Sequence, residues 1–315
     1  MSFIKTKTEL PKIKQIENLN PQEFIDFYQS NSEEIEKELL QFGALKFIGV
    51  EINSTEDFEK ITGSISNKFL NYIDGTSPRT KVSGNIYTST EYDASQKITM
   101  HNELSYSAKW PRKLFFSCIT PAESGGETLL ADSRLILQNM KEEIAESIEE
   151  NGIVYLRNLH AGKGLGMSWK NAFETESKEQ VEAHCRDLNI DFEWRANDSL
   201  RLKQKSKGII SHWKTGEKIW FNQVDQFHPI QLGKEVYEAM AAIYDSPEDF
   251  PTYVTYGNGE PIPVDTIEKI LQCIEEVTVA PKWNRNELLI VDNEMVSHGR
   301  NPYTGQRRVI VSMSA

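Results

Sequence analysis

Apolar residues recur at helical spacing in six segments of the chain. In the first segment they repeat mostly every three or four positions between Pro21 and Gln41, and Gly43 follows as a stop signal. The spacing therefore predicts a helix that ends before this glycine. Patterns of the same kind predict further helices over residues 55–70, 133–150, 178–188, 233–244 and 264–276.

Short apolar runs without helical spacing predict strands between these helices. The runs are residues 44–52, 113–119, 127–132, 152–156, 191–194, 208–213, 218–222, 276–280, 287–292 and 307–314. Runs 113–119 and 127–132 are separated by the turn-forming sequence PAESGG, so we expect them to pair as a hairpin. Helices do not alternate one for one with the strands. This order favours a mixed α/β fold with a mainly β core, a double-stranded β-helix (jelly roll) flanked by helices, over a doubly wound sheet.

The chain shows no internal repeat and no low-complexity segment. Its 315 residues fit a single large domain, because enclosed β folds with added helices often reach this size. We therefore expect a single domain over residues 1–315, in which residues 1–75 form an N-terminal helix and strand module packed on the core.

The charge and the apolar pattern exclude several classes of partner. The formal net charge is −12, so the average surface repels nucleic acid and anionic membranes. No apolar run approaches the roughly 18 residues that span a bilayer, and the first residues lack the apolar stretch of a signal peptide. The three cysteines form no C-x-x-C pair, which argues against a cysteine zinc site. We expect a cytoplasmic protein that acts on a small molecule.

Candidate metal ligands lie at His101, Glu103 and His298. His101 and Glu103 stand where an extended segment meets a loop, and residues two apart on extended backbone project to the same side. His298 follows a buried run and precedes the last predicted strand. Two imidazoles and one carboxylate leave positions open on an octahedral ion, which suits non-haem iron(II). An H-x-E triplet by itself is also compatible with a surface ion pair.

Four further residues are candidate contacts to a substrate. Ser105 and Tyr106 follow the first two ligands closely, and packing is the competing interpretation of both. Asn222 ends an apolar run that either lines the site or closes a core strand. Arg300 lies two residues after His298 and could hold an anionic group, support the metal ligands, or form a surface salt bridge.

Two long segments around these ligands resemble a known family. Residues 97–134, which contain KITMHNELSYSAKWPRKLFFSCITPAESGGETLLADSR, and 288–314, which contain LLIVDNEMVSHGRNPYTGQRRVIVSMS, resemble the TauD/TfdA (taurine dioxygenase-like) family. They look closest to its SyrP-like branch of amino-acid hydroxylases. The resemblance is fainter over residues 208–229 and weak over the first 75. It implies a clavaminate synthase-like jelly roll that uses iron(II), 2-oxoglutarate and O2.

The family pattern maps onto individual residues of this chain. Its metal triad, H-x-D or H-x-E with a distal histidine, corresponds to His101, Glu103 and His298. Its cosubstrate residues, a threonine and an arginine that bind the far carboxylate of 2-oxoglutarate, correspond to Thr128 and Arg308. The neighbouring Arg307 is the rival for the second role. Adjacent strand residues face opposite sides, so only one of the two arginines can enter the pocket, and the family pattern favours Arg308.

The resemblance also bears on the substrate. Taurine-specific members have a sulfonate-binding arginine four residues after the cosubstrate arginine, where this chain has Ser312. Halogenating relatives have a small residue in place of the acidic ligand, where this chain has Glu103. The branch resemblance implies hydroxylation of an aliphatic C–H bond in an amino acid, free or tethered to a carrier protein, in natural product biosynthesis. Two alternatives are a cupin-type dioxygenase or isomerase that does not use 2-oxoglutarate and a metal-free ligand-binding jelly roll. The sequence does not indicate the oligomeric state.

Overall fold

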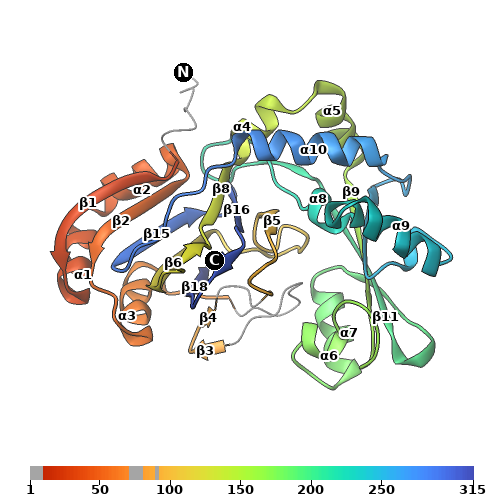
Figure 1. Cartoon of the computed structure of the whole chain (residues 1–315), viewed down its shortest axis with the longest axis horizontal. Coiled ribbons are helices and arrows are strands. Elements are labelled where there is room, and N and C mark those ends of the chain that lie inside the picture. Colours follow the sequence, from red (N-terminus) through yellow and green to blue (C-terminus); the bar gives the residue numbers. More distant parts are fainter. Residues whose placement is uncertain (1–9, 71–80, 89–91) are drawn as a thin grey trace.

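The computed structural model describes residues 10–70, 81–88 and 92–315 (Figure 1). A seven-stranded sheet forms its main layer, in the order β1-β2-β15-β6-β18-β4-β3. β1 is parallel to β2, whereas the pairings that join β2, β15, β6, β18, β4 and β3 are antiparallel. In chain order the strands are β1 (Lys12–Leu19), β2 (Ala44–Val50), β3 (Lys81–Ser83), β4 (Ile86–Thr88), β6 (Lys113–Thr120), β15 (Glu287–Asp292) and β18 (Arg308–Ser314).

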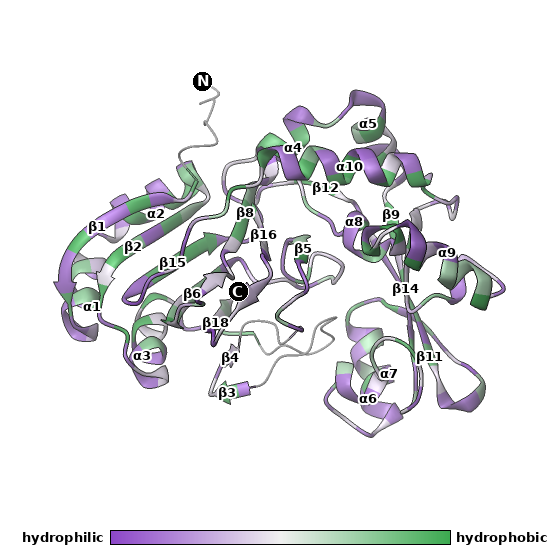
Figure 2. Cartoon of the chain, in the orientation of Figure 1, coloured by the Kyte–Doolittle hydropathy of each residue, from purple (hydrophilic) through white to green (hydrophobic). Residues whose placement is uncertain are grey.

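The two faces of this sheet contact different partners. Helices α1 (Pro21–Ser30), α2 (Ser32–Phe42) and α3 (Thr55–Ile65) cover the outer face, where they pack on residues such as Phe115 and Ile310. On the inner face, residues such as Phe116 and Val309 belong to a larger cluster that includes most of the remaining core. The ribbon of the central strand β15 is largely apolar in Figure 2, as expected for a strand buried on both faces.

A second, three-stranded sheet faces the inner side and carries the candidate ligands. It has the order β5-β16-β8, with β5 (Ile98–His101), β16 (Val296–Arg300) and β8 (Thr128–Asp132) all antiparallel to their neighbours. Helices α4 (Ser133–Asn139) and α10 (Val264–Val277) lie beside it, and α5 (Glu142–Asn151) lies farther from it (Figure 1). Two of the three candidate ligands, His101 and His298, therefore lie on this small, buried sheet, and Glu103 lies in the turn that follows β5.

A four-stranded antiparallel sheet extends the molecule on the side away from the N-terminal helices (Figure 1). Its order is β10-β11-β9-β14, with β9 (Ile153–Leu159), β10 (Asp191–Trp194), β11 (Leu200–Ser206) and β14 (Thr252–Tyr256). The remaining elements are β7 (Ser124–Gly125) with β17 (Tyr303–Thr304), β12 (Ile209–Ser211) with β13 (Lys218–Trp220), helices α6 (Trp169–Ala172), α7 (Lys178–Asp187), α8 (Val224–Phe227) and α9 (Lys234–Ile243), and 3-10 helices at Ala196–Asp198, Pro229–Leu232 and Pro247–Asp249.

The predicted helix over 21–41 is interrupted in the structure at Asn31. The Asn31 side chain donates to the carbonyl of Phe27 at 2.7 Å, and its backbone leaves the helical region with ψ at 15°. Asparagine competes in this way with helical hydrogen bonds, so α1 ends and α2 begins at this residue. The predicted stop at Gly43 is confirmed, because Gly43 ends α2 in a left-handed conformation at φ 75°.

Two predictions about strands were wrong. Strands β6 and β8 do not form a hairpin: β6 pairs with β15 and β18, whereas β8 pairs with β16 in the other sheet. The intervening turn thus crosses between the layers. The expected strand over 276–280 is also absent, since α10 continues to Val277 and Val279 forms only an isolated bridge to Leu130. The helical spacing of Ile270, Ile274 and Val277 extends through the start of that run.

Two structural findings bear on the predicted organisation. The N-terminal strands join the main sheet through the pairing of β2 with β15. The assignment of residues 1–315 to one domain stays a prediction. Within the described ranges, no helix combines the length and the apolar character that a bilayer crossing requires.

Candidate metal centre

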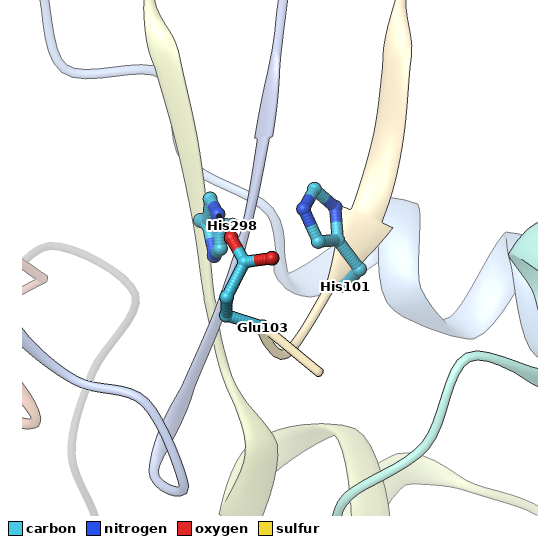
Figure 3. Close-up of side chains that lie close together, drawn as sticks. All are labelled: His101, Glu103 and His298. Atoms are coloured by element: carbon cyan, nitrogen blue, oxygen red, sulfur yellow. Dashed lines mark ion pairs between the residues drawn. The ribbon is translucent and has the colours of Figure 1, made fainter. Parts of the chain in front are cut away.

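The three predicted ligands meet at one point in the molecule (Figure 3). The donor atoms of His101, Glu103 and His298 all lie within 4.8 Å of one another, and the three residues are buried. His298 Nε2 is 3.6 Å from the nearer oxygen of Glu103, and the two imidazole rings are 4.3 Å apart between centroids. Side chains from positions nearly 200 residues apart in the sequence thus converge on a space that one ion could occupy.

Strand pairing brings the two histidines together. His298 of β16 lies directly opposite His101 of β5 in the antiparallel pair, so both side chains stand on the same face. The next residue, Gly299, permits this close approach. A Cβ at Gly299 would lie 2.6 Å from the carbonyl oxygen of Ile98, a backbone atom of the facing strand. Glycine at position 299 therefore allows β16 to approach β5 closely enough for His298 to pair with His101.

The tautomer of His101 is set by the backbone of its own strand. Its Nδ1 lies 2.9 Å from the carbonyl oxygen of Thr99. Because a carbonyl oxygen only accepts, Nδ1 carries the proton and Nε2 keeps its lone pair for a metal. This contact also fixes the plane of the ring, as is common for metal-binding histidines.

Glu103 is held in place by the side chain of Asn293. The Glu103 amide donates to Asn293 Oδ1 at 2.7 Å, and Asn293 Nδ2 donates to the carbonyl oxygens of Glu103 at 3.0 Å and Pro111 at 2.8 Å. The Asn102 side chain in turn donates to the Asn293 carbonyl oxygen at 2.7 Å. The side-chain amide of Asn293 thus satisfies both backbone polar groups of Glu103, the N–H and the carbonyl oxygen.

Replacing Asn293 with alanine should weaken iron(II) binding without removing a ligand. Loss of an outer partner of a metal ligand typically lowers affinity roughly 10- to 100-fold. The backbone groups left unpaired should also lower the thermal midpoint. Anaerobic iron(II) titration measures the first effect, with Asn139→Ala at the exposed end of α4 as the matched control. An unchanged iron affinity in Asn293→Ala would show that Glu103 is positioned by other contacts.

The turn between the ligands is fixed from a second side by Gln223. Its Nε2 donates to the carbonyl oxygen of Asn102 at 2.8 Å and to Ser105 Oγ at 3.1 Å. Leu104 within this turn adopts φ 56°, an uncommon conformation for a residue with a branched side chain. The surrounding contacts therefore hold a strained turn in the shape that presents Glu103 to the histidines.

Thr128 lies on the same face of the three-stranded sheet as His298. It is opposite Arg300 across the β8–β16 pair, while His298 is opposite Leu130, so Thr128 is one same-face position from the ligand. Two residues along a strand span roughly 7 Å. Thr128 Oγ1 accepts a hydrogen bond from Trp283 Nε1 at 2.9 Å, which leaves the hydroxyl proton available for donation to an anion.

The structure places Arg308 away from this face and Arg307 toward it. Arg308 is exposed and donates to Thr55 of α3, on the outer side of the main sheet. Arg307 donates from Nε to the carbonyl oxygen of Gly126 at 2.8 Å, two residues before Thr128. A bulge at this end of β18, where Arg308 pairs with Thr120 and the next residue with Cys118, shifts the register. The orientation does not agree with the predicted role of Arg308, and it favours its neighbour.

The surroundings of Arg307 suit an anion. Burial, together with the like charge of Arg300, lowers the pKa of its guanidinium to about 10. Both guanidinium groups lie beside the ring of Tyr303, at 5.6 Å for Arg307 and 5.0 Å for Arg300. A bound carboxylate would offset the cost of holding two cations in this region.

Arg300 was predicted to contact substrate, to support the metal ligands or to form a surface salt bridge. Its hydrogen bonds indicate a structural role. Its guanidinium donates to the carbonyl oxygens of Tyr92 at 3.3 Å, Asp93 at 2.8 Å and Gln96 at 2.9 Å. These three residues belong to the segment that leads into β5. Arg300 therefore anchors the approach to His101, which agrees with the alternative that it supports the metal ligands.

The other predicted substrate contacts are buried and already engaged. Ser105 Oγ accepts from Gln223. Asn222 donates to the carbonyl oxygen of Gly208 at 2.9 Å and accepts from the amide of Val224 at 3.1 Å, so its side chain secures the start of α8. The ring of Tyr106 packs against Phe227 with centroids 5.4 Å apart. Substrate contact by these residues stays a prediction.

Sequence reasoning missed Asn293 and Gln223, which position the ligand turn. A signal for Asn293 was present: it is an amide that directly follows the buried run 287–292 and precedes His298 by five residues. Gln223 had a similar signal, at the polar end of the run 218–222. Both amides follow buried strands, where a polar side chain requires partners.

The donor set fits iron(II). Two neutral imidazoles and one carboxylate on one side of an ion leave three positions for other ligands, a pattern associated with non-haem iron oxygenases. The His101 ring is oriented by its contact to Thr99, and the backbone of Glu103 by its contact to Asn293, so these two ligands do not depend on the ion alone for their positions. Phe116, whose ring is 5.4 Å from that of His298, supplies an apolar wall.

Comparison with known proteins agrees with this geometry. Residues 7–313 match the model of the family described as "Taurine catabolism dioxygenase TauD, TfdA family". The chain is 34% identical over 279 residues to the dapdiamide synthesis protein DdaC of Enterobacter agglomerans, covering 89% of this chain and 84% of that one. It is 31% identical over 287 residues to a clavaminate synthase-like protein of Arabidopsis thaliana, covering 87% and 82%.

Solved structures show the same fold. A taurine dioxygenase from Burkholderia xenovorans superposes with a TM-score of 0.55 at 11% identity, covering 96% of this chain and 85% of the other. The predicted jelly-roll class is thereby confirmed. Together with the family match, these findings establish the class of enzyme and its cofactors. The chain belongs to the TauD/TfdA family and is an iron(II)- and 2-oxoglutarate-dependent oxygenase.

Proposed function

We propose that this enzyme hydroxylates an aliphatic C–H bond of an amino acid or amino-acid derivative, free or tethered to a carrier protein, in secondary metabolism. The observation that carries the chemistry is the buried convergence of His101, Glu103 and His298. When bound, iron(II) and 2-oxoglutarate supply the oxidising power: O2 delivers one oxygen atom to the substrate and one to succinate, and the keto acid loses CO2.

The protein's own residues bind and orient the reactants. His101 and His298 present Nε2 atoms to the ion, and Glu103 contributes the carboxylate. Thr128 and Arg307 are proposed to hold the far carboxylate of 2-oxoglutarate through a hydroxyl and a guanidinium. A five-carbon dicarboxylate has a length comparable to the separation of Thr128 from His298 along the sheet, so one molecule could reach both the ion and these groups.

Two observations support an amino-acid-type substrate. The relative DdaC is named for the synthesis of dapdiamide, and the sequence similarity covers most of both chains. The position four residues after the cosubstrate arginine, where the resemblance places a sulfonate-binding arginine, is Val311 counted from Arg307 and Ser312 counted from Arg308, and both are uncharged. No positive charge is available at that position to hold a sulfonate.

A succinate-release assay tests this function. Protein reconstituted anaerobically with iron(II) would receive 2-oxoglutarate, labelled O2 and a panel of amino acids, free and loaded on a carrier protein. We expect at least one substrate to accelerate succinate release, with one labelled oxygen in succinate and one in a product heavier by one oxygen atom.

Other results of this assay would identify the alternatives. Turnover of a panel member without 2-oxoglutarate would indicate a cupin-type enzyme. Failure to retain iron would indicate a metal-free binding protein. Succinate release that no amino-acid substrate accelerates, in either form, would remove the substrate proposal.

A further inference from the structure

A buried carboxylate lies on α8 (Val224–Phe227), a helix that contacts β5, and it is not one of the candidate metal ligands. Asp225 on α8 is 2% exposed. Its Oδ1 has no hydrogen-bond partner among residues 10–70, 81–88 and 92–315. Burial raises the pKa of this carboxyl to about 7, while the backbone amides of residues 225 and 226 lower it. An acceptor left unpaired in the interior is costly, so this oxygen requires a donor from outside the described chain.

A second unpaired acceptor lies two residues away. Gln223 is 1% exposed, and its Oε1 likewise finds no partner within the described part of the chain. The other end of the same side chain is bonded to Asn102 and Ser105 in the metal-ligand turn. Asn102 lies between ligands His101 and Glu103. The segment that carries the two acceptors is thus connected directly to the backbone that carries the metal ligands.

Aromatic residues surround this segment. The backbone amide of Gln223 donates to the Tyr155 hydroxyl at 2.8 Å. Burial raises the pKa of that hydroxyl, and the charge of Asp225 adds to this rise. The rings of Tyr155 and Phe227 are 4.6 Å apart, and Tyr106 packs on both. Arg157, two residues from Tyr155 on the same face of β9, lies with its guanidinium 5.0 Å from the centre of the Tyr106 ring. Acceptors, rings and a cation are therefore gathered on one side of the metal-ligand turn.

The chemistry of these groups selects the ligand. Both unpaired atoms are acceptors, so a single group that satisfies both of them must donate at least two hydrogen bonds. A primary ammonium offers three donors and a positive charge, which also offsets the buried carboxylate. A hydroxyl offers one donor, and an N-acylated amine offers one donor without charge.

We propose that Asp225, with Gln223 Oε1, binds the free ammonium group of the substrate and so places the amino-acid carbon skeleton next to the metal centre. This proposal rests on the proposed function and sharpens it. The amine of the substrate is unmodified, whether its carboxyl end is free or joined to a carrier.

The test compares matched probes with Asp225→Asn. The probes are the common L-amino acids, their N-acetyl derivatives and the corresponding 2-hydroxy acids, and the readout is succinate release above the rate without substrate. Asparagine keeps the shape and one acceptor but removes the charge. Asp265→Asn, at an exposed position on α10, is the control for the substitution itself.

We expect only amine-bearing probes to stimulate the wild-type enzyme. In Asp225→Asn, kcat/KM for a stimulating amino acid should fall roughly 10- to 200-fold, as expected for a hydrogen bond to a charged group, mainly through KM. The thermal midpoint at pH 8 should not fall, because the substitution removes a buried unpaired charge.

Three results would overturn the proposal. They are stimulation by N-acetyl or 2-hydroxy probes at least as strong as by amino acids, an unchanged KM in Asp225→Asn, and a lower thermal midpoint of Asp225→Asn together with lost substrate-independent succinate release. The last result would indicate a purely structural role. Failure of the proposed function itself is distinguishable, because no amino acid or amino-acid derivative, free or on a carrier, would then accelerate succinate release by the wild-type enzyme.

Discussion

Replacing His298 with alanine should abolish succinate release and reduce iron(II) affinity by more than the roughly 10- to 100-fold that loss of an outer partner costs. The substitution removes one of three donors that converge within 4.8 Å, and the remaining pair cannot enclose an ion on three sides. Because His298 is buried opposite His101 in a paired strand, the fold should survive the truncation with a moderate loss of stability.

A surface histidine provides the control for this experiment. His160→Ala removes an imidazole whose Nδ1 accepts only a local bond from the amide of Gly162. Its succinate release should match that of the wild type. Retention of both iron and turnover by His298→Ala would contradict the proposed ligand set, as would equal losses in the two variants.

Replacing Arg307 with leucine should raise the KM for 2-oxoglutarate at least roughly 30-fold, whereas Arg308→Leu should change it by less than about threefold. Truncating one partner of a buried charge pair costs on the order of 2–5 kcal/mol, while a solvated arginine contributes about 1 kcal/mol or less. Arg307 faces Gly126 and the Thr128 strand, whereas the exposed Arg308 faces Thr55 on the outer side of the main sheet. The two neighbours thus serve as variant and matched control.

The measurement is the 2-oxoglutarate dependence of succinate release, together with iron retention. Both variants should bind iron like the wild type, since neither residue is a ligand. If Arg308→Leu shows the larger rise in KM, the orientation at the start of β18 changes when the cosubstrate binds, and the family pattern identifies the arginine correctly. Equal and small effects in both variants would remove the arginine from the cosubstrate site.

The ligands could be predicted from the sequence because the information is local. An i, i+2 pair needs only an extended backbone, and β5 supplies it up to His101. The position of His298 near a buried strand was also readable. Its pairing with β5 was not, because β16 carries polar residues and glycine and shows little strand pattern.

Other features depend on contacts that no local pattern reveals. Whether Arg307 or Arg308 faces the candidate site depends on a bulge between Arg308 and Val309. The bulge shifts the strand register, and no sequence pattern predicts it. The layer crossing between β6 and β8 looks like an ordinary hairpin turn in sequence. Asp225 has no apparent role until its burial is known, since an aspartate in a short polar segment is normally solvated.

An anaerobic titration with iron(II) tests the central claim most directly. Wild-type protein should bind a single equivalent, and addition of 2-oxoglutarate should produce the visible charge-transfer absorption of an iron(II)–keto acid chelate, with neither effect in His298→Ala. Wild-type protein that binds no iron, or a His298→Ala variant that titrates like the wild type, would contradict the claim that His101, Glu103 and His298 together hold the metal.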